Sequence, residues 1–205
     1  MQPALDRITG AFWTDPRLPE LYPRLLLELH PLVRAGSPIL ELAAKVAEGR
    51  VDDPLGPPLA EYYAEHADEE RGHDEWVLDD LEHLGYDREQ VRARVPSAPV
   101  AALFGAQYFW VLHAHPLALM GYVACIEGRP ALEPELDGII ERTGLPSAAF
   151  SNYRNHARLD PQHRADIHAL LDRLPLDDRH HELLGLSAMY TCNALGSLFT
   201  SLSRP

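Results

Sequence analysis

Apolar residues recur at the three- and four-residue spacing of an amphipathic helix through most of this chain, most clearly over residues 59–84. This stretch opens behind Pro57 and Pro58, which suit a first helical turn, and stops at Gly85, a residue type that commonly ends helices. One stripe along it comprises Leu59, Tyr63, His66, Glu70, His73, Val77, Leu81 and Leu84. The pattern predicts a single long helix, interrupted only by Gly72, with this stripe turned toward the core.

The same periodicity predicts helices over most of the remaining chain. They span residues 19–34, 38–48, 98–127, 133–143, 146–174 and 178–202, with a kink or split at Pro116. We expect residues 1–17 to form an irregular arm, residues 49–58 a loop, and residues 86–96 a charged connection. No segment keeps the two-residue period of a strand for long. The prediction is an all-α fold, with residues 1–205 forming a single helical-bundle domain of about seven or eight helices.

The middle of the stripe in residues 59–84 is polar, and a second segment repeats that arrangement. HADEERGH at residues 66–73 and HARLDPQH at residues 156–163 share the pattern H-x3-(E/D)-x2-H. The three polar residues fall on successive turns of one helix face, with apolar positions on either side. Because a buried carboxylate is costly unless it is paired or bound to a metal, two matching interruptions predict two helices that face each other across a metal site. They also hint at a pseudo-twofold core.

These motifs supply most of the candidate ligands. They are Glu70, His73, His156, Asp160 and His163, with His66 as either a further ligand or a neighbour that orients a carboxylate. The alternative is a solvated helix face, because charged residues surround Glu70 and His73 in the sequence. The stripe argues against that alternative, since those neighbours project from other faces of the helix.

Glu127 is a candidate of a different kind. It ends the apolar run of residues 98–127, immediately before Gly128. A carboxylate at a helix C-terminus meets the negative end of the helix dipole, which is unfavourable unless a cation lies nearby. Two interpretations stay open here, a metal ligand and an exposed terminal glutamate.

Composition excludes several classes of partner. The formal net charge is −13 and Lys45 is the only lysine, so we expect neither a nucleic-acid nor an anionic-membrane partner. The longest apolar run, residues 117–126, is too short to span a bilayer, and the N-terminus lacks the pattern of a secretory signal. Cys125 and Cys192 form no C-x-x-C motif. We interpret them as reduced thiols of a cytoplasmic protein, with their pairing left open.

The type of ligand narrows the metal. Imidazole and carboxylate without thiolate suit iron, manganese or zinc, and the candidates outnumber the ligands of one tetrahedral zinc ion. Inward-facing glutamates and Glu-x-x-His groups on bundle helices build dinuclear iron and manganese sites. The leading expectation is therefore a pair of non-heme iron ions, with manganese as the alternative and O2 as co-substrate.

The chain resembles the iron-containing redox enzymes of the heme-oxygenase-like diiron oxidase and oxygenase superfamily in three segments, EYYAEHADEERGHDEWVLDDLEHLG, HPLALMGYVACIEG and NHARLDPQH. The resemblance spans residues 59–174 and implies a heme-oxygenase-like fold. The implied ligands are Glu70, His73 and Glu127 for one iron and His156, Asp160 and His163 for the other, with Glu70 bridging. Glu70, Glu127 and Asp160 are then the expected catalytic carboxylates, and His66 is an addition to the family's pattern.

The resemblance also implies an activity, the O2-dependent oxidation of a small substrate such as an amino acid, an amine or a fatty acid. Natural-product or specialised metabolism is the expected setting, with electrons from an external donor, and a homodimer is the expected assembly. Three alternatives remain. They are a metal-free thiaminase-like hydrolase or transferase with Cys125 or Cys192 as nucleophile, a heme protein with His30 as axial ligand, and a non-catalytic helical binding protein.

Pro161 directly follows Asp160 and removes an amide donor from the second motif. The sequence predicts either a kink at this point or a new helix that starts there. We expect residues 152–168 to be partly disordered without metal, because repulsion between the ligands and their loss of hydration oppose folding until a cation binds.

Overall fold

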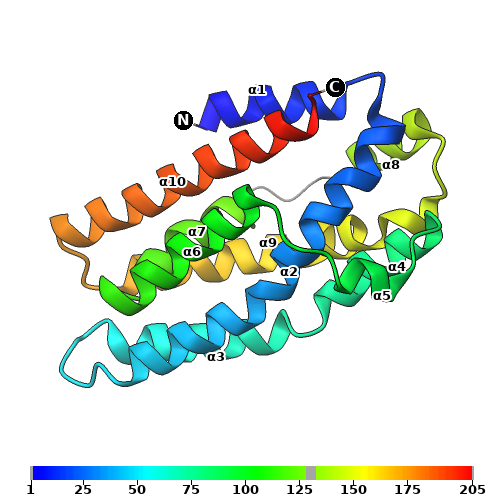
Figure 1. Cartoon of the computed structure of the whole chain (residues 1–205). Coiled ribbons are helices and arrows are strands. Elements are labelled where there is room, and N and C mark those ends of the chain that lie inside the picture. Colours follow the sequence, from blue (N-terminus) through cyan, green and yellow to red (C-terminus); the bar gives the residue numbers. More distant parts are fainter. Residues whose placement is uncertain (1, 128–132, 205) are drawn as a thin grey trace.

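The computed structural model describes residues 2–127 and 133–204, and within these ranges every regular element is a helix (Figure 1). The elements are α1 (Gln2–Trp13), α2 (Leu18–Glu48), α3 (Gly56–Glu69), α4 (His73–His83), α5 (Arg88–Arg92), α6 (Ala98–His113), α7 (Ala118–Ile126), α8 (Glu133–Thr143), the 3-10 helix η1 (Ser147–Phe150), α9 (Ser151–Arg173) and α10 (Asp178–Leu202). The all-α prediction is confirmed. Nowhere in the two described ranges is a helix both long and apolar enough to cross a membrane.

Helix α2 crosses the molecule as one continuous element, with α3 packed along it (Figure 1). The sequence predicts two helices here, residues 19–34 and 38–48, and that prediction is wrong. The helix runs through Pro23, Pro31 and Pro38. An interior proline costs a helix about 3 kcal/mol by itself. Burial of apolar residues of α2 against α3, α4 and α6 offsets this cost, and a local pattern cannot show such remote contacts.

The predicted long helix of residues 59–84 is instead two helices, α3 and α4. Gly72, between them, has a φ of 86°, a left-handed conformation that only glycine adopts without strain. The interruption makes Glu70 the C-terminal cap of α3 and His73 the first residue of α4. The first motif therefore bends at its centre, whereas α9 carries the second motif unbroken through Pro161, with no new helix starting there.

Two short segments that the sequence does not predict as helices also correct the expected fold. The expectation of an irregular arm over residues 1–17 is wrong, because residues 2–13 form α1, which lies beside α10 (Figure 1). Phe12 of α1 is buried and meets Phe199 edge to face, with ring centroids 5.2 Å apart. Helix α5 adds a single turn to the charged connection, where Asp87 caps it by accepting from the Gln90 amide.

Three other predictions agree with the structure. The apolar run divides around Pro116 into α6 and α7, as expected. Helices α8 and α10 occupy the expected residues 133–143 and 178–202. In these three cases the helical punctuation and the apolar periodicity of the sequence agree with the observed bounds.

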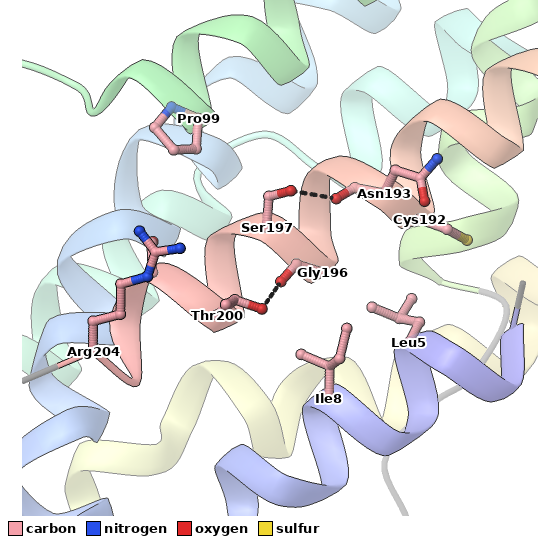
Figure 2. Close-up of a pocket in the computed structure, with 10 residues that line it drawn as sticks. Leu5, Ile8, Pro99, Cys192, Asn193, Gly196, Ser197, Thr200 and Arg204 are labelled. Atoms are coloured by element: carbon pink, nitrogen blue, oxygen red, sulfur yellow. Dashed lines mark hydrogen bonds between the residues drawn. The ribbon is translucent and has the colours of Figure 1, made fainter.

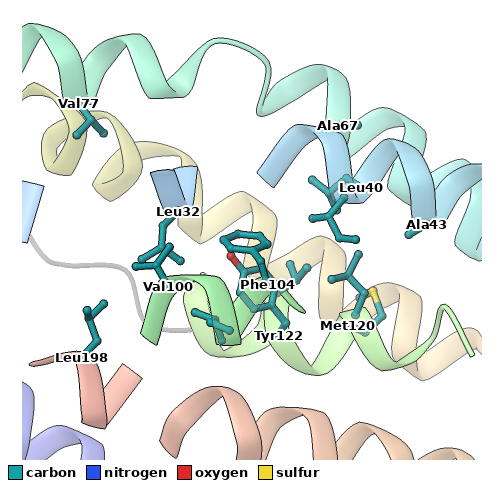
Figure 3. Packing of buried hydrophobic residues seen from close by; sticks show 14 of the residues in the cluster. Leu32, Leu40, Ala43, Ala67, Val77, Val100, Phe104, Met120, Tyr122 and Leu198 are labelled. Carbon is teal, nitrogen blue, oxygen red and sulfur yellow. The ribbon is translucent and has the colours of Figure 1, made fainter. Parts of the chain in front are cut away.

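One apolar core joins these helices and determines where the motifs lie. Figure 3 shows Phe104 of α6 beside Tyr122 of α7, whose ring centroids are 5.8 Å apart. Two buried tyrosines fix the segments that flank the motifs. The Tyr63 hydroxyl donates to the Pro116 carbonyl at 2.9 Å, and the Tyr22 hydroxyl donates to the Ala149 carbonyl at 2.8 Å. Helix α3 is thereby held to the α6–α7 turn, and α2 to the segment that leads into α9.

Candidate metal centre

Four segments meet in one place: the end of α3, the start of α4, the residue after α7, and the middle of α9. They bring together two groups of possible ligands, His66, Glu70, Glu127 and His163 in the first and Glu70, His73 and His156 in the second. Within each group the ligand atoms all lie within 4.8 Å of one another. Glu70 is common to both groups.

Glu127 lies between the two histidines of the first group. Its Oε1 is 3.0 Å from His66 Nε2, and its Oε2 is 3.2 Å from His163 Nδ1. The rings of His66 and His163 meet edge to face, with centroids 4.7 Å apart. All three residues are buried, so their polar atoms depend on one another or on a bound ligand for partners. The exposed terminal glutamate that the sequence left open at residue 127 is not what the structure shows.

The second group is smaller and lies under an aromatic side chain. His73 Nδ1 is 3.2 Å from Glu70 Oε2, and the His73 ring meets the His156 ring edge to face at 5.2 Å. Trp76 stacks on His73 with ring centroids 3.8 Å apart and also contacts the His156 ring. His156 Nδ1 donates to the Asn152 carbonyl at 2.9 Å, which leaves the lone pair on Nε2 for a metal ion.

The contacts between the two motifs are crossed. The first histidine of one motif faces the last histidine of the other, so that His66 meets His163 and His73 meets His156. Two copies of one motif on oppositely directed helices give this pattern, in agreement with the pseudo-twofold core that the repeat suggested.

The assignment of ligands to two ions that the resemblance implied differs from this geometry. It placed Glu127 with His73 and placed His156 with His163. The structure instead groups Glu127 with His66 and His163, and groups His156 with His73. The order of residues along a motif does not contain this information, because the crossing of the helices decides which members meet.

Asp160 belongs to neither group among the described residues. It is buried, and its Oδ1 has no hydrogen-bond partner. Burial, reinforced by the negative charge of Glu127, raises the pKa of Asp160 to about 7. Ligation by Asp160 stays a prediction, but the carboxyl lies in surroundings that favour a proton or a nearby cation.

In the first group, protons on the imidazole rings of His66 and His163 balance the negative charge of Glu127. Burial alone would raise the pKa of Glu127, but the facing His163 and His66 lower it to about 2. Burial opposes protonation of His66, yet Glu127 and Glu70 raise its pKa to about 9. Burial likewise opposes protonation of His163, whose pKa Glu127 nonetheless raises. A divalent cation would take the place of these protons.

The buried polar atoms that lack a partner test whether a metal fits. Those in this cluster are Glu70 Oε1, His73 Nδ1, Glu127 Oε2, Asp160 Oδ1 and His163 Nδ1. Folded proteins leave few such atoms unsatisfied, and here several face one another without forming hydrogen bonds. Once deprotonated, each of these nitrogen and oxygen atoms offers a lone pair, the type of donor that iron and manganese bind. The residues present therefore fit a metal of this kind.

Two further side chains, Glu69 and Tyr62, lie beside the cluster. Glu69, interpreted as a solvated neighbour, has its Oε2 3.5 Å from His66 Nδ1 and 3.6 Å from His163 Nε2. Tyr62 stacks on His66 with ring centroids 5.4 Å apart, and its buried hydroxyl has no partner. Tyr62 is an aromatic residue next to the first motif, and its position one turn before His66 agrees with this contact. Glu69 lies three residues after His66, a helical spacing that signals that contact, whereas its approach to His163 depends on how the helices pack.

Asp80 of α4 supports the second motif from a distance. Its Oδ1 accepts hydrogen bonds from the Ser151 amide and hydroxyl at 2.7 and 2.6 Å, and its Oδ2 accepts from the Asn152 amide at 3.1 Å. Asp80 is fully buried and satisfies amides at the start of α9, where Phe150 supplies no capping side chain. The Asn152 carbonyl then orients His156. Hydrogen bonds thus link α4 to a candidate ligand.

A cavity elsewhere on the molecule lies apart from the candidate metal centre. Figure 2 shows it between α1, α10 and Pro99 at the start of α6, with a volume of about 620 Å³. None of the candidate ligands lines it. The hydroxyls of Ser197 and Thr200 donate to carbonyls of their own helix, at 2.9 and 2.7 Å, so they are not free for chemistry.

Comparison with a family model defines the class of this protein. The model of the iron-containing redox enzymes matches residues 29–195, most of the chain, and the protein belongs to that family. The matched residues include all of the candidate ligands. No match was found among curated proteins.

Solved structures show the same fold. A domain of unknown function with a heme oxygenase-like fold from Shewanella denitrificans OS217 superposes with a TM-score of 0.79 at 17% sequence identity, covering 98% of this chain and 83% of that one. A TenA homolog from Pseudomonas syringae pv. tomato DC3000 gives a TM-score of 0.73 at 12% identity, covering 98% of this chain and 88% of that one. The heme-oxygenase-like fold expected from the sequence is confirmed.

Proposed function

We propose that this protein is a non-heme diiron oxidase or oxygenase that uses O2 to oxidise a small substrate, such as an amino acid, an amine or a fatty acid. The observation that carries the proposal is the sharing of Glu70 between two groups of possible ligands. A single ion needs one such group, whereas a carboxylate held in common suits two neighbouring ions. Membership of the iron-containing redox enzymes supports iron as the metal.

In this proposal each side chain has a role that follows from its contacts. His66, Glu127 and His163 would hold one ion, His73 and His156 would hold the other, and Glu70 would join them. When bound, the iron pair supplies the electron-transfer chemistry of O2 reduction.

The surrounding side chains would prepare the site for that chemistry. The Asn152 carbonyl fixes the His156 tautomer, and Trp76 covers His73 against water. Asp160, with a pKa of about 7, is able to hold or release a proton beside the pair. An external electron donor, a cytoplasmic location and a homodimer complete the proposal.

Metal analysis with matched variants tests this function. Protein loaded anaerobically with Fe(II) and then desalted should retain two irons per chain and consume O2 on exposure to air. Glu70→Gln should lose most of the iron, because it removes the shared anionic ligand. Glu65→Gln, on the exposed surface of the same helix, should keep it. Retention of one iron or none by the unmodified protein would contradict the diiron proposal.

A metal-free thiaminase-like hydrolase or transferase is the second candidate, because a TenA homolog shares the fold. Such an enzyme needs a reactive thiol, and a thiolate is the reactive form. Cys125 Sγ lies 3.5 Å from Cys192 Sγ and donates to the Ala188 carbonyl at 3.4 Å. Burial, reinforced by Cys192, raises the pKa of Cys125 to about 12, which opposes nucleophilic chemistry.

Replacement of the thiol separates the two functions. Cys125→Ser should leave O2 consumption and iron content unchanged if the diiron proposal holds. Loss of a hydrolase or transferase activity in Cys125→Ser, in protein that folds normally and binds no iron, would favour the thiol-dependent candidate.

A further inference from the structure

The two cysteines of the chain lie side by side, although they are 67 residues apart in the sequence. Cys125 belongs to α7 and Cys192 to α10, and their Sγ atoms are 3.5 Å apart. Both are free thiols, and both are half-buried rather than enclosed. The sulfur atoms of a disulfide are about 2.05 Å apart, so this pair has to close by only about 1.5 Å to form one.

Close packing of the two helices brings the thiols together. Gly121 lies one turn before Cys125 on α7. A Cβ added at this glycine would be 2.7 Å from the Leu184 carbonyl oxygen and 2.9 Å from the Ala188 nitrogen, so α7 approaches α10 here as only glycine allows. One turn further along, Cys125 Sγ donates to the Ala188 carbonyl at 3.4 Å and meets Cys192. The contact between the thiols therefore follows from the packing of the backbones.

The side of α10 that carries Cys192 is open to a small reagent. Cys192 is one of the residues that line the cavity of about 620 Å³ between α1, α10 and the start of α6 (Figure 2). A reactive thiol has to be accessible to its oxidant and its reductant, and this position meets that condition. In a reducing compartment, a disulfide that does form is usually transient and serves catalysis or redox sensing.

The same turn of α7 carries a candidate metal ligand on its opposite side. Glu127 follows Cys125 by two residues, which corresponds to about 200° around a helix. Its carboxylate meets His66 of α3 and His163 of α9, whereas Cys125 meets α10. Formation of a disulfide would draw this turn toward α10 and so draw Glu127 away from the two histidines.

We propose that Cys125 and Cys192 form a reversible disulfide, and that this bond weakens metal binding at the candidate metal centre. The disulfide itself does not depend on the proposed function. Its effect on the metal does rest on that function, because it acts through Glu127.

Hydrogen peroxide is the oxidant in this proposal. One thiol attacks the peroxide and becomes a sulfenic acid, while the O–O bond breaks and water leaves. The second thiol attacks the sulfenic sulfur, the S–O bond breaks, the S–S bond forms, and a second water leaves. The two sulfur atoms lose two electrons, which the peroxide gains, and both thiol protons end in water. A dithiol reductant reverses the reaction by thiol–disulfide exchange.

Peroxide treatment of the full chain, freed of metal by a chelator, tests the disulfide. Mass spectrometry of a digest should find one pair of peptides joined through Cys125 and Cys192 within a single chain, and dithiothreitol should separate them. Cys125→Ser and Cys192→Ser should each form no such bond. Oxidation of the thiols to sulfinic acid without a disulfide, or bonds between chains alone, would overturn the proposal.

Binding of Mn(II) to the oxidised and the reduced protein tests the effect on the metal centre. Calorimetry should show about tenfold weaker binding after oxidation, with full recovery after dithiothreitol is added and then removed. In Cys192→Ser the same peroxide treatment should leave the affinity unchanged, which controls for oxidation at other residues. Equal affinity of the two forms would overturn the proposed effect. Absence of Mn(II) binding in the reduced protein would contradict the proposed function, and the effect with it, but not the disulfide.

Discussion

The same eight-residue motif appears at the end of α3 and in the middle of α9, and the backbone conformation differs between the two copies. In the first copy the helix breaks between Glu70 and His73, with Gly72 in the left-handed conformation. In the second copy the helix continues through Pro161, a residue that locally opposes it. Identical spacing in the sequence therefore does not give identical geometry.

The consequence is visible in the two carboxylates at the centre of the motifs. Glu70, at the break, belongs to both groups of possible ligands, whereas Asp160, on the straight helix, belongs to neither. Glutamate also carries one more methylene than aspartate and therefore reaches further. The helix break after Glu70 and the longer glutamate side chain together explain why Glu70, and not Asp160, belongs to both groups of possible ligands.

The largest expected effect separates these two carboxylates. If the diiron proposal holds, Glu70→Gln should lose most of the iron and lower activity by on the order of a hundredfold or more, because both groups lose their common anion. Asp160→Asn should keep most of the metal and lower activity by about tenfold, through loss of a proton carrier. Iron content and O2 consumption are the measurements. Equal loss of iron in the two variants would show that Asp160 is a ligand of the same rank and would remove the asymmetry between the motifs.

Loss of the hydrogen bonds that hold the start of α9 to Asp80 of α4 should have the next largest effect. Asp80→Ala leaves the amides of Ser151 and Asn152 without their acceptor and should lower the free energy of unfolding by about 1–3 kcal/mol. Asp79→Ala, which removes a half-exposed carboxylate of the same helix that pairs with Arg88, should lower it by less than about 1 kcal/mol. Chemical denaturation measures both. In Asp80→Ala the His156 ring should also lose its fixed tautomer, which NMR of the imidazole nitrogens detects; an unchanged ring would show that α9 needs no support from α4.

Backbone strain at Gly72 should have a slightly smaller effect. Gly72→Ala meets no atom within 4 Å, so its cost is the left-handed conformation alone, about 1–2 kcal/mol. Gly105→Ala, which is equally open but lies inside α6, should stabilise the protein by about 0.5–1 kcal/mol. Thermal unfolding of the two variants compares them. If Gly72→Ala is as stable as the unmodified protein, the break between α3 and α4 does not depend on glycine.

Much of the fold and of the site follows from the sequence, and the exceptions share one cause. Helices α8 and α10 and the break at Pro116 have local signals, and so have the histidines of both motifs. Contacts remote in sequence account for the rest. Helix α1 forms against α10, α2 continues through three prolines because it is packed on several sides, and Glu69 of α3 lies near His163 of α9. The pairing of Glu127 with His66 and His163 likewise depends on how helices cross, which the order of residues along a motif does not encode.

The smallest predicted effect is a pH dependence of the protein's stability. His66 of the first motif and Asp160 of the second contribute to it in different pH ranges. The pKa of His66 is raised to about 9 in the metal-free protein, so its contribution to stability is present below its unfolded value, about 6.5, and is lost as the pH rises through about 9. The pKa of Asp160 is raised to about 7, so ionisation of this buried carboxyl lowers stability between about pH 4 and pH 7. Both effects make the metal-free protein less stable as the pH rises. A bound cation removes the need for either proton, so the increase in Tm caused by Mn(II) should grow by a few degrees between about pH 6 and pH 9.

Two variants assign the parts of this pH dependence. His66→Gln should flatten it above about pH 7, and Asp160→Asn should flatten it below about pH 7, because each substitution removes the group that titrates in that range. Differential scanning calorimetry with and without Mn(II), across a pH series, measures the effect. A metal-induced increase in Tm that is constant with pH, or largest in acid, would mean that the cation does not replace protons at His66 and Asp160. The two motifs would then face each other for a reason other than metal binding.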